Sequence, residues 1–211
     1  MGPPISKVIL TIDPLQLWGS LTLVVNTGRR ERRKLETRRR LDEAALNLFL
    51  EHGYDGVTVA QIAEAADISV ATLFAHVPDG KEALIFDDGT ERRAGIVAAV
   101  RDRADGETVL DALHRFFAGR GPYSTTQTAK RDLIVSTPAL RSYARRLWHS
   151  CEPELVAVLA EESGLAADDP TVLALARFVL EVPDLTGTAP DPVAALAGVF
   201  EVLRSGWPGK G

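Results

Sequence analysis

Residues 58–81 contain two short helical patterns joined by a tight turn, in the sequence TVAQIAEAADISVATLFAHVPDGK. Thr58 is suited to cap the first helix, and Gln61, three residues later, completes a capping box. Pro78 disfavours helical geometry at the residue before it and so ends the second helix. Two short helices at this spacing predict a helix-turn-helix, whose second helix is shaped to lie in the major groove of DNA.

A long helix is predicted immediately upstream, because apolar residues recur there at helical spacing. They are Leu41, Ala44, Ala45, Leu48 and Phe49. Gly53 provides a left-handed stop, and Tyr54 is expected to fold back onto the end of this helix.

The rest of the chain also has a helical pattern. We expect a long helix at about 79–103, begun by an Asp79 cap, then helices at 107–119, 138–163, 170–182 and 192–205, with a looser stretch at 123–136. The predicted fold is therefore all-α: a three-helix helix-turn-helix domain followed by a helical ligand-binding and dimerisation domain. We divide the chain into a flexible extension at 1–28, a basic arm with the helix-turn-helix at 29–78, and a regulatory domain at 79–211.

A strongly basic segment precedes the helix-turn-helix. Residues 29–40 hold eight basic side chains against two acidic ones, whereas the whole chain of 211 residues has a net charge of −5. Residues 82–211, with 14 basic and 19 acidic side chains, account for that negative total. Because DNA responds to local charge, an acidic total does not exclude DNA binding. The basic segment is expected to act as an arm in a flanking minor groove, or else to be the solvated start of the first helix.

Several other classes of protein are disfavoured. The single cysteine, Cys151, excludes an internal disulfide and fits a reducing cytoplasm. It could sense redox state, although a passive buried thiol is the simpler interpretation. Residues 8–25 are apolar but interrupted by Asp13, Pro14 and Gly19, so no membrane helix is expected. The four histidines lack metal-ligand spacing, and neither a phosphate loop nor a nucleophile elbow is found. No metal, cofactor or catalytic residue is predicted.

The run LDEAALNLFLEHGYDGVTVAQIAEAADISVATLFAHVPDGKEAL, residues 41–84, resembles the N-terminal domain of TetR-family transcriptional regulators. The resemblance implies a homodimer that binds a palindromic operator in double-stranded DNA. It also implies a small-molecule effector pocket in the body and a dimer interface made by the last two helices. Three features depart from the family pattern: Asp67 stands at a usual glycine, Phe74 lacks the usual aromatic hydroxyl, and one extra residue precedes Lys81.

The resemblance also implies which residues contact DNA. Thr58, His76 and Lys81 would bind phosphates, and Ser69, Val70, Ala71, Thr72 and Ala75 would face base edges. From the basic segment we add Arg29, Arg30, Arg32, Arg33 and Arg38 as DNA-binding candidates. The second helix of the motif has no Arg, Asn or Gln, so it lacks bidentate base contacts worth roughly 1–3 kcal/mol each. Discrimination is therefore expected to depend on the basic segment and on DNA shape.

Candidates in the body are aromatic and apolar side chains. The pocket candidates, each of which could instead be a core residue, are Phe116, Phe117, Tyr123, Tyr143, Trp148 and His149. The dimer-interface candidates lie on broad apolar faces of the last two helices: Val172, Leu175, Val179, Leu196, Val199, Phe200 and Leu203. The predicted function is a dimeric DNA-binding regulator, a repressor released by a small molecule. The alternative is a small-molecule-binding or catalytic helical protein with a vestigial DNA-binding head.

Overall fold

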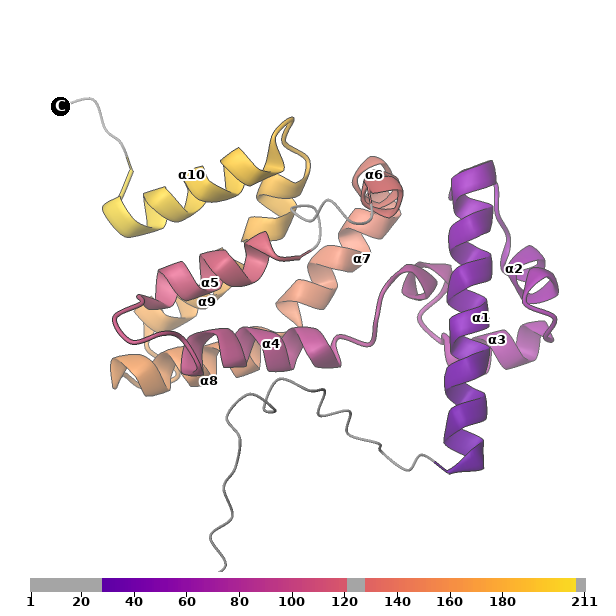
Figure 1. Cartoon of the computed structure of the whole chain (residues 1–211), viewed down its shortest axis with the longest axis horizontal. Helices are drawn as coiled ribbons and strands as arrows, with labels where there is room; N and C mark the ends of the chain where they lie inside the picture. Colours follow the sequence, from indigo (N-terminus) through magenta and orange to yellow (C-terminus); the bar gives the residue numbers. More distant parts are fainter. Residues whose placement is uncertain (1–27, 121–127, 208–211) are drawn as a thin grey trace, which may run out of the picture.

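A computed structural model describes residues 28–120 and 128–207, and every regular element in these residues is helical (Figure 1). The N-terminal helices are α1 (Arg29–His52), α2 (Val59–Ala65) and α3 (Val70–His76), followed by the 3₁₀ helix η2 (Lys81–Ile85). The remaining helices are α4 (Thr90–Arg101), α5 (Val109–Ala118), α6 (Thr128–Ser136), α7 (Pro138–His149), α8 (Glu152–Ser163), α9 (Pro170–Gly187) and α10 (Pro192–Ser205). The expected all-α class is confirmed, and the extension predicted at 1–28 lies outside the described residues except for Gly28.

The first helix ends as its sequence predicts. Gly53 has a φ of 74° and donates its backbone N–H to the Phe49 carbonyl at 3.0 Å. Tyr54 then folds back, so that its ring centroid lies 5.2 Å from that of Phe49. Leu41, Ala45 and Phe49 form the buried stripe of α1, against which α2 and α3 pack.

The hydrophobic core of this head continues beyond the helix-turn-helix. Ala83, Leu84 and Ile85 of η2 and Leu140 of α7 are buried in the same cluster as the α1 stripe. In Figure 1 the head (α1–α3) stands at one side of the molecule, and α6 and the start of α7 lie between it and the other body helices. The domain division at residue 78 therefore stays a prediction, while the packing joins η2, α6 and α7 to the head.

The prediction of a single long helix at 79–103 is wrong. Gly80, with a φ of 99°, precedes the short η2, and Gly89, with a φ of 79°, precedes α4. Between them the Asp87 carboxylate accepts the Gly89 N–H at 2.7 Å, and the Asp88 carboxylate accepts the Thr90 N–H at 2.9 Å. These local hydrogen bonds compete with the helical ladder and leave a non-helical linker at 86–89.

The long helix expected at 138–163 is also divided, because α7 ends at His149 and α8 begins at Glu152. Pro153 explains the break. It has no N–H to donate and its ring would collide with the carbonyl four residues earlier, whereas the first turn of a new helix accepts proline without this cost.

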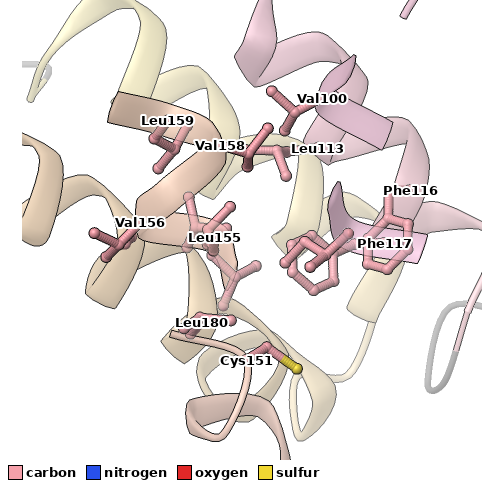
Figure 2. Close-up of a cluster of buried hydrophobic side chains, with 14 of the residues drawn as sticks. Val100, Leu113, Phe116, Phe117, Cys151, Leu155, Val156, Val158, Leu159 and Leu180 are labelled. Atoms are coloured by element: carbon pink, nitrogen blue, oxygen red, sulfur yellow. The ribbon is translucent and has the colours of Figure 1, made fainter. Parts of the chain in front are cut away.

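In the last pair of helices, α9 continues through Pro183 to Gly187, five residues beyond the expected end at 182. α10 has the predicted bounds. The core of the body is formed by α4, α5, α8, α9 and α10, with Phe117, Leu155 and Leu180 among its buried side chains (Figure 2).

Candidate nucleic-acid interface and ligand cavity

The turn between α2 and α3 determines how α3 is presented. Asp67 has a φ of 53° and is the one residue other than glycine with a positive φ in the described part of the chain. The predicted capping box is confirmed: Thr58 Oγ1 accepts the Gln61 N–H at 3.3 Å, and Gln61 Oε1 accepts the Thr58 N–H at 2.8 Å. The Ser69 hydroxyl caps α3 by accepting the Thr72 N–H at 3.1 Å.

One face of α3 is open to solvent. Leu73 and Val77 are buried in the head, whereas Phe74 is 49% exposed and Val70 is 39% exposed. The remaining predicted base-contacting residues, Ser69, Ala71, Thr72 and Ala75, are also exposed. This face offers methyl groups and an aromatic ring, but its two hydroxyls already bond to each other, with 2.8 Å between Ser69 Oγ and Thr72 Oγ1.

His76 closes α3 in a partly buried position. Burial lowers the pKa of its imidazole, and the positive charges of Lys34 and Arg38 lower the pKa further. Both effects favour the neutral form of the ring. The influence of Lys34 also places the basic start of α1 near the end of α3.

The basic segment is not an extended arm, because residues 29–40 form the first turns of α1. Arg38 points inward: its guanidinium donates to the Asp42 carboxylate at 2.8 Å, to the Phe86 carbonyl at 3.1 Å and to the Ala83 carbonyl. This arginine thus ties α1 to the linker, and its DNA contact stays a prediction that would compete with these internal hydrogen bonds.

The other basic residues of α1 fall into two groups. Arg39 pairs with Glu36 and Glu43, and Arg40 donates to the Ala66 carbonyl. Arg32, Arg33 and Lys34 are exposed and form no ion pair with another described residue. The side chains of Arg29 and Arg30 lie outside the described part of the structure.

Lys81 is also bonded within the head. Its ammonium donates to the Tyr54 and Val57 carbonyls, each at 2.7 Å, and lies 4.0 Å from the centroid of the Tyr54 ring. Two of its three N–H groups are thereby used to fix the link between α1 and α2. Its predicted phosphate contact would depend on the third.

A cavity of about 340 Å³ lies where the linker after η2 meets α4, α6, α7 and α9. Its apolar lining includes Phe86, Ile134, Val135, Trp148 and Pro183. Its charged lining comprises Arg92, Arg120, Lys130, Arg131, Arg141 and Arg145 with Asp87, Glu91 and Asp184. Because the linker forms part of the wall, a molecule in this cavity would touch the segment that connects the body to the head.

Comparison with known proteins identifies the group to which this architecture belongs. Residues 42–87 match the family described as bacterial regulatory proteins, tetR family. The HTH-type transcriptional regulator TcmR of Streptomyces glaucescens is 32% identical over 152 residues, which span 67% of this chain and 67% of that protein. The chain belongs to the TetR family. It is accordingly a helix-turn-helix transcriptional regulator.

Further relatives agree with this TetR-family assignment. The putative mycofactocin biosynthesis transcriptional regulator MftR of Mycobacterium tuberculosis is 27% identical over 138 residues, 63% of this chain and 69% of that protein. The structure of Thermus thermophilus FadR, a TetR-family repressor in complex with lauroyl-CoA, gives a TM-score of 0.54 at 24% identity, over 82% of this chain and 99% of that one. Salmonella enterica GusR gives 0.53 at 23% identity, over 82% and 95%. The two structures support the fold.

The cavity of this TetR-family chain is not built from the aromatic residues predicted for it. Of the five candidates that the structure describes, only Trp148 lines it. Phe116 and Phe117 are buried in the body core, and Tyr143 stacks on Phe86 with 5.3 Å between ring centroids. His149 Nε2 lies 3.0 Å from Glu181 Oε1, and Tyr123 lies outside the described residues. From the sequence, Arg145 and Arg146 beside Trp148 could attract an anionic ligand, although a solvated face is the simpler interpretation. Arg145 lines the cavity, and Arg141 stands one helical turn before it. The other basic lining residues were not predicted.

The predicted dimer-interface residues mostly face the interior of their own chain. Val172, Val179, Leu196 and Phe200 are buried in the body core, and Leu175, Val199 and Leu203 pack against it. Apolar breadth on α9 and α10 is explained by contacts with α5, α7 and α8. The side chains that remain available are different ones: Phe178, Leu185 and Val193 are 41%, 57% and 56% exposed.

The structure also bears on Cys151, on metal binding and on membrane-spanning helices. Cys151 is fully buried, and burial raises the pKa of its thiol, so the chemical environment is that of an unreactive cysteine. Among the described residues, no group of His, Cys, Asp or Glu could hold a metal ion, and no helix is long and apolar enough to cross a membrane.

Proposed function

We propose that this TetR-family regulator binds a palindromic operator in double-stranded DNA as a homodimer, and that it is a repressor released by a small molecule. The observation that carries the proposal is the presentation of α3. Its inner face is fixed in the head by Leu73, its start is capped by Ser69, and its outer face is exposed. The proposal places the protein in the cytoplasm, with no catalytic activity and no cofactor.

On the DNA, α3 would lie in the major groove with Val70, Ala71, Thr72 and Ala75 near base edges, and the capped start of α2 at Thr58 would meet a phosphate. Arg32, Arg33 and Lys34 would supply the cations, because they are exposed and unpaired among the described residues. Because these residues are helical, they are placed to contact phosphates along the edge of a groove. Insertion into the minor groove would instead require an extended arm.

For dimerisation we propose the outer faces of α9 and α10. Phe178 and Leu185 are seven residues apart and therefore share one face of α9, and Val193 is exposed at the start of α10. Exposed apolar residues gathered on two neighbouring helices are typical of an isologous interface.

Release would act through the linker. Ile85, Phe86 and Asp87 line the cavity, while Arg38 of α1 holds the Ala83 and Phe86 carbonyls. A ligand that shifts the linker therefore shifts α1 and the head with it. The two heads of a dimer must keep their recognition helices about 34 Å apart to enter successive major grooves, so a small displacement lowers operator affinity.

The test is fluorescence anisotropy with palindromes from the region upstream of the coding sequence, at 50 to 300 mM salt. We expect specific binding with a steep salt dependence. An Arg32→Ala/Arg33→Ala variant should bind at least tenfold more weakly, whereas Arg101→Ala/Arg115→Ala, which removes two exposed arginines of the body, should bind normally. Failure of the folded dimer to bind any upstream fragment at low salt would favour the alternative of a vestigial head.

A further inference from the structure

The charges around the cavity define the chemistry of its ligand, an inference that rests on the proposed ligand-controlled function. Four of the six basic side chains that line it are neutralised by carboxylates. Arg92 pairs with Asp87 at 3.2 Å and Arg141 with Asp184 at 3.2 Å. Arg131 pairs with Asp132 at 2.8 Å, and Arg145 Nε lies 3.0 Å from Glu181 Oε2.

Arg120 and Lys130 differ from these four. No carboxylate of the described residues lies within ion-pair distance of either side chain. Asp42 and Asp87 are near enough to favour the charged form of Lys130, but burial opposes them and lowers the pKa of its ammonium. Glu91 is the one lining carboxylate without an ion-pair partner among the described residues, so two unpaired cations face one unpaired anion. The cavity therefore carries a surplus of one positive charge.

Two of the arginines that line the cavity, Arg120 and Arg92, lie against aromatic rings. The Arg120 guanidinium lies over the Phe116 ring, 4.1 Å from its centroid, and the Arg92 guanidinium lies over the Trp148 ring at 5.0 Å. Stacking fixes the plane of a guanidinium and leaves its N–H edge for a planar acceptor. Arg92 Nη1 is in addition buried without a hydrogen-bond acceptor in the described chain, which is costly for a charged donor.

The uncharged part of the wall is mostly apolar. Phe86, Ile134, Val135, Trp148 and Pro183 contribute side chains from the linker, α6, α7 and α9. A pocket of this composition buries the hydrocarbon part of a ligand, while a few polar groups fix its orientation. The volume of about 340 Å³ is in the range of pockets for small organic molecules.

We infer that the cavity binds an organic monocarboxylate with a compact apolar body, whose carboxylate contacts Arg120 and Lys130. The single surplus charge matches one carboxylate, and the planar guanidinium matches its two oxygens. The apolar body lies against Trp148, Ile134 and Pro183, next to the linker.

Two probes that differ in charge test this inference by isothermal titration calorimetry on the full chain: 2-naphthoate and the neutral 2-naphthalenemethanol. We expect the wild type to bind naphthoate at least tenfold more tightly than the alcohol. Arg120→Gln/Lys130→Gln should remove that preference by weakening naphthoate alone. The matched control Arg101→Gln/Arg115→Gln loses the same formal charge at exposed sites outside the cavity and should keep the preference.

Arg120→Gln alone, at an exposed position, serves if the double variant does not fold, and it should lower naphthoate affinity about tenfold. Equal affinity for the two probes, no binding of naphthoate, or an unchanged preference in the folded cavity variants would overturn the inference. Operator binding without ligand is measured separately on the same proteins. Charge-selective naphthoate binding without operator binding would reject the proposed function and keep the ligand class; the reverse result would reject only the ligand class.

Discussion

Arg32 and Arg38 lie six residues apart on α1 and differ in their surroundings. Arg32 is exposed, whereas Arg38 makes hydrogen bonds to Asp42 and to two carbonyls, one in the middle of η2 and one in the linker. An arginine in a basic run is thus exposed to solvent or bonded inside the protein according to what packs beside it. At this scale the sequence supplies the charge, and the neighbours decide its role.

Substitution of these two arginines should affect different properties of the protein. Arg38→Ala should lower the free energy of unfolding by about 1–3 kcal/mol, because it leaves carbonyls and Asp42 without their partner. Arg32→Ala should change that free energy by less than about 0.5 kcal/mol but reduce the salt dependence of operator binding by about one counterion per protomer. Urea denaturation and anisotropy measure the two effects. A large loss of stability in Arg32→Ala would contradict the division of roles.

Asp42 should make stability fall as pH rises. Burial raises the pKa of its carboxyl to about 6, against the lowering effect of Arg38. The unfolded chain ionises near 3.9, so between about pH 4 and 6 the folded state holds a proton that the unfolded state has released. This contribution is complete below pH 4 and lost above pH 6.

Asp42→Asn removes this ionisation. Its free energy of unfolding, measured in urea at pH 4.5 and 7, should therefore decrease less over that interval than that of the wild type. Asp55→Asn, at an exposed position, is the control and should behave as the wild type does. Identical losses in Asp42→Asn and the wild type would show that Asp42 ionises normally.

At the scale of elements, the helix-turn-helix follows its local sequence closely. The capping box at Thr58, the left-handed Asp67 and the Ser69 cap are short-range features, because each depends only on residues within a few positions of it. The body helices depend more on breaks that periodicity does not reveal. Pro153 and Gly89 interrupt patterns that look continuous, whereas Pro183 is accommodated inside α9, where Val182 and Pro183 are buried.

The turn offers a direct test of backbone strain. Asp67→Gly should raise the free energy of unfolding by about 0.5–1 kcal/mol, because glycine adopts a positive φ without strain. Its carboxylate is 99% exposed and 3.6 Å from Arg40, so little is lost with the side chain. Asp67→Ala should lower stability, and so should Asp55→Gly, where φ is not positive. Thermal unfolding measures all three, and a destabilised Asp67→Gly would contradict the argument.

At the scale of the whole molecule, the head and the body are joined by packed helices rather than by a flexible hinge. η2, α6 and the start of α7 pack on the head, and the cavity lies directly behind them. A ligand bound there would contact the linker, which is itself hydrogen-bonded to Arg38 of α1. The outer faces of α9 and α10 keep exposed apolar side chains, among them Phe178, Leu185 and Val193.

Assembly can be tested on the exposed side chains of α9. Phe178→Ser should convert the proposed dimer to a monomer without unfolding it, because this side chain is 41% exposed and contributes little to the core of its own chain. Leu165→Ser, at a position that is 46% exposed outside α9 and α10, should leave the dimer intact. Light scattering after size-exclusion chromatography gives the mass. A Phe178→Ser protein that remains dimeric would reject this interface.

Much of the head could be predicted from the sequence. The helix caps, the stop at Gly53 and the apolar stripe of α1 depend on residues that are close in the chain. The family match over residues 42–87 agrees with the helix-turn-helix that they predict. The division of the arginines between solvent, linker and cavity could not be predicted, because Arg38 meets Phe86, and Arg145 meets Glu181, only when distant helices pack.

The sequence by itself determined an all-α chain with a DNA-binding helix-turn-helix, since helical periodicity and capping are local properties of the polypeptide. Only the tertiary structure decided which apolar faces of α9 and α10 are core and which remain exposed, because burial depends on the neighbours that the fold supplies. It also decided that the cavity is lined by basic side chains from four separate segments. Long-range packing, rather than any one segment, brings those charges together.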